Sequence, residues 1–169
     1  MGRTLRILNV EDSERDVALL LRHVKMAGYE VVSERVDTGD EMRASLESQE
    51  WDLILCDYSM PHFDALSALD VLRNSGIDIP FIIISGTVGE EVAVRAMLTG
   101  AHDYLPKNNL TRLIPAIERE LQQADNRREK QQSDQDRRRS DDRYRTLFEY
   151  APDGILIAND QSYYLDANT

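Results

Sequence analysis

The stretch Trp51-Asp-Leu-Ile-Leu-Cys-Asp57-Tyr-Ser-Met-Pro61 decides which fold this sequence predicts. Its apolar run, residues 53–56, has the length of one buried strand, and Pro61 stops that strand because proline lacks the N–H that a ladder needs. Asp57 therefore stands at the carboxyl end of a strand, where open parallel α/β sheets bind their ligands. A lone carboxylate in such a place is commonly a solvated turn residue. Its meaning depends on what the other strands bring to the same edge.

β-like runs and helical patterns alternate along the chain on both sides of this stretch. The β-like runs are 5–10, 29–36, 51–56, 79–85 and 103–107. Helical apolar spacing covers 13–27, 38–46, 65–75, 88–98 and a segment that begins near 113. Such alternation predicts an α/β fold, a doubly wound five-stranded parallel sheet in the flavodoxin-like order 2-1-3-4-5 with five helices.

The last helix is predicted to start at Pro115, after a separate turn over Leu110–Ile114, because proline is tolerated only at a helix start. We expect this helix to extend. Residues 125–143 contain seven basic and six acidic residues and no apolar one. A helical connector and a solvated linker are both compatible with that composition. The predicted organisation is a domain over 1–124, a charged helical linker over 125–143 and the start of a second domain over 144–169.

The composition narrows the class of protein. The chain has 169 residues, of which 41% are hydrophobic and 30% charged, with a net charge of −11. Such a charge disfavours nucleic acid as a partner and favours a cation. The single cysteine, Cys56, cannot form an internal disulfide, which fits the cytoplasm. We expect no membrane segment, because the apolar runs are far shorter than the ~20 residues that a bilayer requires. His62 and His102 have no metal-ligand partner at useful spacing, so surface or turn roles are expected.

Chemically useful side chains stand at the ends of several predicted strands. Glu11 and Asp12 follow the first strand, Asp57 ends the third, Ser85 ends the fourth and Lys107 follows the fifth. Strands 1 and 3 are neighbours in the predicted order, so three carboxylates meet in one crevice. They repel one another unless a cation lies between them, and hard oxygen ligands suit Mg²⁺. A nucleophilic carboxylate, a metal, an amine and a hydroxyl are the groups needed to place a phosphoryl group on an aspartate.

These residues form motifs that resemble a known family. The motifs are Glu11-Asp12, Asp57-Tyr-Ser-Met-Pro61, Ser85-Gly86-Thr87 and Tyr104-Leu-Pro-Lys107. In order and spacing they are similar to the receiver domain of the two-component response regulators, over residues 1–124. The resemblance implies a phosphoacceptor switch of a phosphorelay rather than an enzyme in its own right, apart from Mg²⁺-dependent self-phosphorylation and dephosphorylation.

The resemblance also implies roles for the residues of the crevice. Asp57 would take a phosphoryl group from a phosphohistidine on a partner histidine kinase or phosphotransfer protein. Asp12 and Asp57, with the backbone carbonyl of Ser59, would hold Mg²⁺, and Glu11 would act mostly through water. The signal would pass to a C-terminal output module.

Three further residues receive implied roles. Ser85 and Tyr104 would form a switch pair, in which Ser85 bonds the phosphoryl group and the Tyr104 ring turns inward. Lys107 would bind the phosphoryl group. In the family a proline with a cis peptide usually follows this lysine, but Asn108 follows here, and a cis non-proline bond costs about 3 kcal/mol. Thr87 is expected to cap the fourth helix rather than to tune the phosphate.

The tail Tyr144-Arg-Thr-Leu-Phe-Glu-Tyr-Ala-Pro-Asp-Gly-Ile resembles the start of a PAS sensor domain, cut short. A homodimer through the fourth and fifth helices and the linker is also expected. One alternative function is a receiver-like interaction module that docks partners without phosphorylation. A phosphatase with an aspartyl nucleophile is weaker, because it would want a second acid two residues after Asp57, where Ser59 stands.

Overall fold

The computed structural model divides the chain into two units, Met1–Asp125 and Asn126–Thr169, each with its own internal contacts. The residues that it describes are 3–86, 90–150, 156–158 and 164–167. No helix in these ranges combines the length and the apolar content needed to cross a membrane. The expectation that Thr87 caps the fourth helix lies outside the described residues.

A parallel sheet forms the centre of the first unit. Its strands are β1 (Thr4–Val10), β2 (Glu30–Val36), β3 (Leu53–Asp57), β4 (Phe81–Ser85) and β5 (Asp103–Pro106). They pair in the order β2-β1-β3-β4-β5, and every neighbouring pair is parallel. The predicted five-stranded sheet and its strand order are confirmed.

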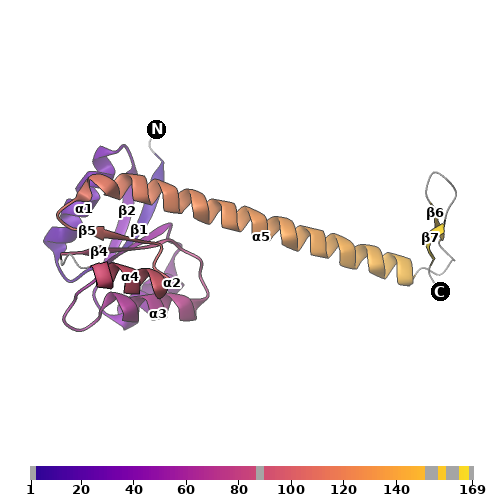
Figure 1. Cartoon of the computed structure of the whole chain (residues 1–169), viewed down its shortest axis with the longest axis horizontal. Helices are drawn as coiled ribbons and strands as arrows, with labels where there is room; N and C mark the ends of the chain where they lie inside the picture. Colours follow the sequence, from indigo (N-terminus) through magenta and orange to yellow (C-terminus); the bar gives the residue numbers. More distant parts are fainter. Residues whose placement is uncertain (1–2, 87–89, 151–155, 159–163, 168–169) are drawn as a thin grey trace. The chain divides into compact units, whose positions relative to one another are not determined.

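Helices cover both faces of this sheet (Figure 1). They are α1 (Glu14–Met26), α2 (Gly39–Ser48), α3 (Ala65–Ser75), α4 (Glu90–Leu98) and α5 (Leu113–Glu149). One apolar cluster contains buried side chains from α2, α3 and α4, and the other contains buried side chains from α1 and from the first part of α5. The fold is therefore a three-layer α/β arrangement, as the alternation of patterns predicted.

The central strand β4 shows why the apolar runs are continuous. Phe81 and Ile83 pack into the cluster with α2 and α3, whereas Ile82 and Ile84 pack into the cluster with α1 and α5. Successive side chains of a strand point to opposite faces, so a strand covered on both faces must be apolar at every position. All four side chains are at most 1% exposed. Polar residues are consequently confined to the strand ends, and Ser85 is the last residue of β4.

Side-chain caps fix where the helices begin and hence where the loops of the site run. Ser13 accepts a hydrogen bond from the Asp16 N–H at 3.2 Å and starts α1, directly after the end of β1. Thr38 accepts from the Glu41 N–H at 3.3 Å and starts α2. Serine and threonine are favoured at this position because their hydroxyls satisfy an N–H that has no intrahelical partner.

The predicted start of the fifth helix was wrong by two residues. A short 3₁₀ turn covers Leu110–Arg112, and α5 begins at Leu113 rather than at Pro115. Pro115 is thus the third helical residue. The N–H that it lacks is among the first four of a helix, which have no intrahelical acceptor, so proline costs little there.

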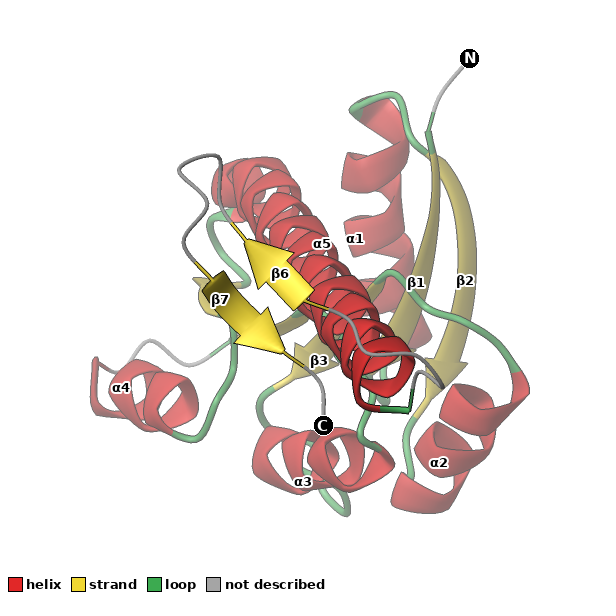
Figure 2. Cartoon of the chain, turned by 90° about the vertical axis from the view of Figure 1, so that its right-hand side faces the viewer, coloured by secondary structure: helices red, strands yellow, loops and turns green. Residues whose placement is uncertain are grey.

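Helix α5 continues without a break through residues 125–143, which confirms the extended C-terminal helix. Beyond it, β6 (Leu156–Ala158) and β7 (Tyr164–Ala167) pair antiparallel (Figure 2). Within the second unit the rings of Tyr144 and Phe148 stack with centroids 5.6 Å apart. A PAS identity for this segment stays a prediction.

Candidate functional site

The candidate site lies where β1 and β3 end side by side. The two strands pair in parallel with Val10 beside Cys56, so the residues that follow β1 lie next to the last residue of β3. Glu11 and Asp12 follow β1, and Asp57 ends β3. Each of the three places a carboxylate oxygen within 4.8 Å of the other two. The structure therefore brings together the three carboxylates that the sequence predicted to meet.

Glu11 is the most deeply buried member of the cluster, at 3% exposure. Its N–H donates to the Val36 carbonyl at 3.0 Å, and its carboxylate accepts from the Ser13 N–H at 3.1 Å. Burial raises the pKa of Glu11 to about 7, against the opposing hydrogen bonds from Lys107 and Ser13 and with the aid of the nearby Asp57 charge. The charge of this group near neutral pH therefore depends on which cations lie beside it.

The donor set fits a hard divalent cation. Asp57 is buried at 8% exposure, whereas Asp12 is exposed, so the cluster opens to solvent on one side. Carboxylate oxygens are the ligands that Mg²⁺ prefers, and Mg²⁺ usually keeps several waters, which the open side accommodates. Ser59, the fourth predicted ligand, is exposed in the loop between β3 and α3.

Lys107 enters the same crevice from the end of β5. Its backbone N–H donates to the Ser85 carbonyl at 2.7 Å, which places the lysine beside the end of β4. Its Nζ lies 3.1 Å from Asp57 Oδ2 and 3.0 Å from Glu11 Oε2. It also lies 2.6 Å from Asp16 Oδ2. Burial lowers the pKa of Lys107, but the hydrogen bonds to Asp16, Glu11 and Asp57 outweigh it and raise the pKa above its ordinary value.

The loop after Lys107 allows the amine to lie at the Asp57 carboxylate. The backbone has no cis peptide bond among the described residues, so the bond between Lys107 and Asn108 is trans. The amine nevertheless reaches Asp57. The departure from the family pattern at Asn108 does not remove Lys107 from the site.

Ser85 and Tyr104 lie on the opposite face of the sheet from Leu105. Tyr104 pairs with Ile83 in the ladder between β4 and β5, and its half-buried ring packs against the cluster that contains Ile83. Ser85 is two residues further along β4 and is 1% exposed. Because side chains alternate along a strand, Ser85 and Tyr104 share one face of two adjacent strands. A switch pair, in which one side chain moves in response to the other, requires such neighbouring positions.

Sequence reasoning missed one residue of the site, Asp16. Its carboxylate makes the shortest contact with the Lys107 amine, at 2.6 Å. Asp16 lies in the first turn of α1, the helix that begins directly after the end of β1, and this places it beside the crevice. The two histidines have the plain roles expected of them: His62 is exposed, and the His102 ring accepts from the Phe81 N–H at 3.1 Å.

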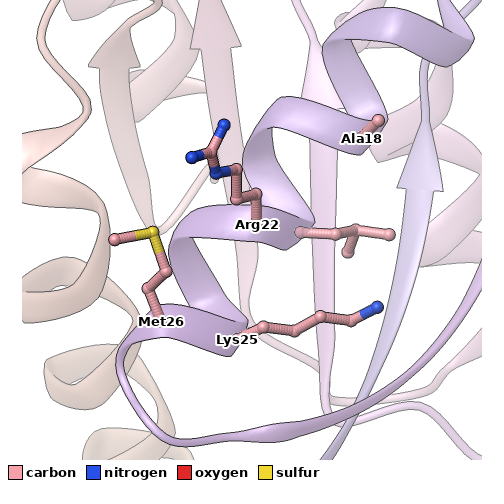
Figure 3. Close-up of a pocket in the computed structure, with 5 residues that line it drawn as sticks. Ala18, Arg22, Lys25 and Met26 are labelled. Atoms are coloured by element: carbon pink, nitrogen blue, oxygen red, sulfur yellow. The ribbon is translucent and has the colours of Figure 1, made fainter.

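A separate shallow hollow of about 490 Å³ lies on α1. It is lined by Ala18, Leu21, Arg22, Lys25 and Met26, whose side chains spread from the later turns of the helix (Figure 3). It contains none of the predicted site residues. The carboxylate cluster, and not this hollow, holds the groups that can do chemistry.

Glu11→Gln should remove a pH-dependent loss of unfolding free energy from the metal-free protein. A carboxyl whose folded pKa is raised from 4.5 to about 7 destabilises the fold as pH rises through that window, because the folded state then loses a proton that it holds more tightly than the unfolded state. Relative to wild type, the variant should gain about 2 kcal/mol of unfolding free energy as pH rises from about 4.5 to about 7, with little further change above that. Urea denaturation in EDTA measures this difference. A difference in unfolding free energy between variant and wild type that stays constant with pH would contradict the effect of burial on the pKa of Glu11.

Comparison with known proteins identifies the family. Residues 7–118 match the family model of the response regulator receiver domain. Since the match covers more than half of the chain, the chain belongs to the response regulator receiver family.

Relatives and solved structures agree with this assignment. The transcriptional regulatory protein PrrA of Mycobacterium tuberculosis is 32% identical over 102 residues, which are 60% of this chain and 43% of PrrA. A protein-glutamate methylesterase/protein-glutamine glutaminase of Paramagnetospirillum magneticum is 37% identical over 112 residues, 64% of this chain and 29% of that protein. The chain thus spans less than half the length of these relatives. The signal receiver domain of a Luxo repressor protein from Vibrio parahaemolyticus superposes with a TM-score of 0.63 at 28% identity, over 72% of this chain and 93% of the other.

Proposed function

We propose that this chain is the phosphoacceptor switch of a two-component phosphorelay and that Asp57 is the acceptor. One observation supports this most directly. Asp57 ends a buried strand with the carboxylates of Glu11 and Asp12 within 4.8 Å and the Lys107 amine at 3.1 Å. A nucleophile, a candidate cation site and a positively charged amine thus lie close together at the end of β3.

The proposed reaction is a phosphoryl transfer from a phosphohistidine on a partner histidine kinase or phosphotransfer protein. A carboxylate oxygen of Asp57 forms a bond to phosphorus as the bond between phosphorus and the imidazole nitrogen breaks. The bonding electron pair stays on that nitrogen, which takes a proton from solvent. Lys107 neutralises charge on the phosphoryl oxygens.

Asp12, Asp57 and the backbone carbonyl of Ser59 would hold Mg²⁺, with Glu11 acting through water. When bound, the ion supplies positive charge that stabilises the transferring phosphoryl group. Burial, with a smaller contribution from the nearby Asp57 charge, raises the pKa of Glu11, and a bound cation would favour the anionic form of this carboxyl.

Ser85 and Tyr104 are the proposed switch pair. Ser85 stands at the end of β4 next to the acceptor strand, since Asp57 pairs with Ile84 in the ladder between β3 and β4. A phosphoryl group on Asp57 would draw the Ser85 hydroxyl towards it, and the half-buried Tyr104 ring would fill the space vacated. The surface of α4, β5 and α5 would then shift between two populated states.

The proposal also includes the domains that would pass the signal on. We take 1–124 as the receiver domain, 125–143 as a charged helical linker and 144–169 as the beginning of a PAS-like domain. A homodimer through α4, α5 and the linker would carry the signal along the continuous helix. This chain supplies no catalytic activity of its own beyond self-phosphorylation and dephosphorylation, whereas a catalytic module can follow a receiver, as in the methylesterase relative.

The charge and the cysteine content support a cytoplasmic protein that does not bind nucleic acid directly. The net charge of −11 opposes direct binding to nucleic acid. The free Cys56 is buried, which fits the reducing cytoplasm.

The Mg²⁺ dependence of labelling separates the switch from a docking module. We expect the purified chain to gain one phosphoryl group from a small acyl phosphate donor in Mg²⁺ and to gain none in EDTA. The readout is the intact mass. An interaction module without phosphorylation would stay unlabelled under both conditions, and that result would reject the proposed function.

A further inference from the structure

The Lys107 ammonium group contacts three carboxylates, one for each of its N–H donors. Its Nζ lies 2.6 Å from Asp16, 3.0 Å from Glu11 and 3.1 Å from Asp57. Glu11 and Asp57 belong to the carboxylate cluster, but Asp16 does not. The shortest of the three contacts is therefore made to the one carboxylate that has no part in the candidate metal site.

The backbone of Asp16 is fixed at the start of α1, next to the crevice. It is the third residue of α1, and its N–H donates to the capping hydroxyl of Ser13 at 3.2 Å. Its side chain is 37% exposed, compared with 3% for Glu11. The hydrogen bond from Lys107 lowers the pKa of Asp16 below its ordinary value.

A small hollow of about 80 Å³ lies beside Asp16 and Lys107. Its lining consists of Asp16, Leu19, Leu20, Lys107 and Leu110. The hollow lies on the α1 side of the amine and includes neither Glu11 nor Asp57.

Two cations compete for the same oxygens at this site. An ammonium group bonded to Glu11 and Asp57 occupies acceptors that a divalent ion requires, and the two like charges repel each other at close range. An anionic partner outside the metal site would hold the amine in the crevice while the ion occupies those oxygens. Asp16 is such a partner, at 2.6 Å from Nζ.

We propose that Asp16 is a positioning residue that draws the Lys107 amine towards α1 and thereby frees Glu11 and Asp57 for the divalent ion. The proposal rests on the proposed function in one respect, namely that the cluster of Glu11, Asp12 and Asp57 binds such an ion. Asp16 itself contacts neither the ion nor the phosphoryl group. It acts through Lys107.

A double-mutant cycle on the full chain tests this role with Mn²⁺ alone, through the loss of the free-ion EPR signal. Asp16→Asn should weaken Mn²⁺ binding about 5- to 20-fold, because the amine is left with only the metal-site carboxylates. Lys107→Met should strengthen binding by removing the competitor. In the Lys107→Met background, Asp16→Asn should change the affinity by less than about twofold.

Two further variants separate positioning from general charge and from misfolding. Glu14→Gln removes an equal charge from the first turn of α1, at a side chain that is 86% exposed and lies near Arg35, and it should change the affinity by less than about twofold. Asp16→Glu restores a carboxylate and should recover most of the affinity. Recovery would show that the weakened variant had not simply lost its fold.

The outcomes distinguish this proposal from the proposed function. Asp16→Asn could weaken Mn²⁺ binding equally in the wild-type chain and in the Lys107→Met variant. That result would show a through-space charge effect and would overturn the positioning role alone. Failure of the wild-type chain to bind Mn²⁺ would overturn the metal site, and the role of Asp16 with it.

Discussion

Asp57→Asn should reduce phosphoryl labelling by a small acyl phosphate donor by about a thousandfold or more, to the background of the assay. The amide has nearly the shape of the carboxylate but lacks its nucleophilic charge, and removal of a nucleophile eliminates the covalent step rather than slowing it. Asp57 ends β3 and is 8% exposed, so a replacement of equal size preserves the packing. Intact-mass spectrometry over a time course in Mg²⁺ measures the effect.

Asp70→Asn is a matched control for this loss. Asp70 is an exposed carboxylate on α3, 4.0 Å from Arg73, and it lies outside the cluster. Its replacement removes the same charge and should leave the labelling rate within about twofold of wild type. Persistent labelling of the Asp57→Asn protein at wild-type rates would reject Asp57 as the acceptor.

Asp12→Ala should weaken Mn²⁺ and Mg²⁺ binding by about 100-fold or more. Loss of a group that merely supports a ligand typically costs 10- to 100-fold in metal affinity, so loss of a direct ligand should cost at least that. Asp12 is exposed, and its truncation leaves no cavity in the core. Labelling measured at a fixed low Mg²⁺ concentration should fall in parallel with affinity and recover when Mg²⁺ is raised.

Recovery of labelling at high Mg²⁺ distinguishes the loss of a metal ligand from the loss of the acceptor. A variant that regains labelling at high Mg²⁺ has lost affinity and not the acceptor, which is the role proposed for Asp12. Glu14→Ala, which removes an exposed carboxylate two residues further on, should retain near-wild-type affinity. Unchanged metal binding by Asp12→Ala would contradict the assignment of Asp12 as a ligand.

The fold was predictable because its signals are local and repeated. The apolar run of β4, Phe81-Ile-Ile-Ile-Ser85, is short and rich in β-branched residues, which is typical of a strand buried on both faces. Helical spacing and capping patterns between such runs then imply crossovers, and crossovers imply a parallel sheet. The start of α5 was mispredicted because Pro115 marks only the first turn of a helix, and sequence does not distinguish the positions within that turn.

The site was predictable to the level of which strand ends carry which groups. Glu11, Asp12 and Asp57 meet because parallel neighbours end at the same edge of the sheet. The bonding of the Lys107 amine was not predictable in the same way. A lysine side chain is long and flexible, and its partner Asp16 comes from a helix on which the same residue also fits a capping pattern.

The central claim is that one carboxylate of this chain accepts the phosphoryl group. Borohydride reduction of the labelled, Mg²⁺-loaded protein, followed by peptide mapping, converts an aspartyl phosphate to homoserine and locates it. The account predicts homoserine at position 57 and at no other carboxylate. Labelling located at Asp12, at Glu11 or away from the cluster would contradict it.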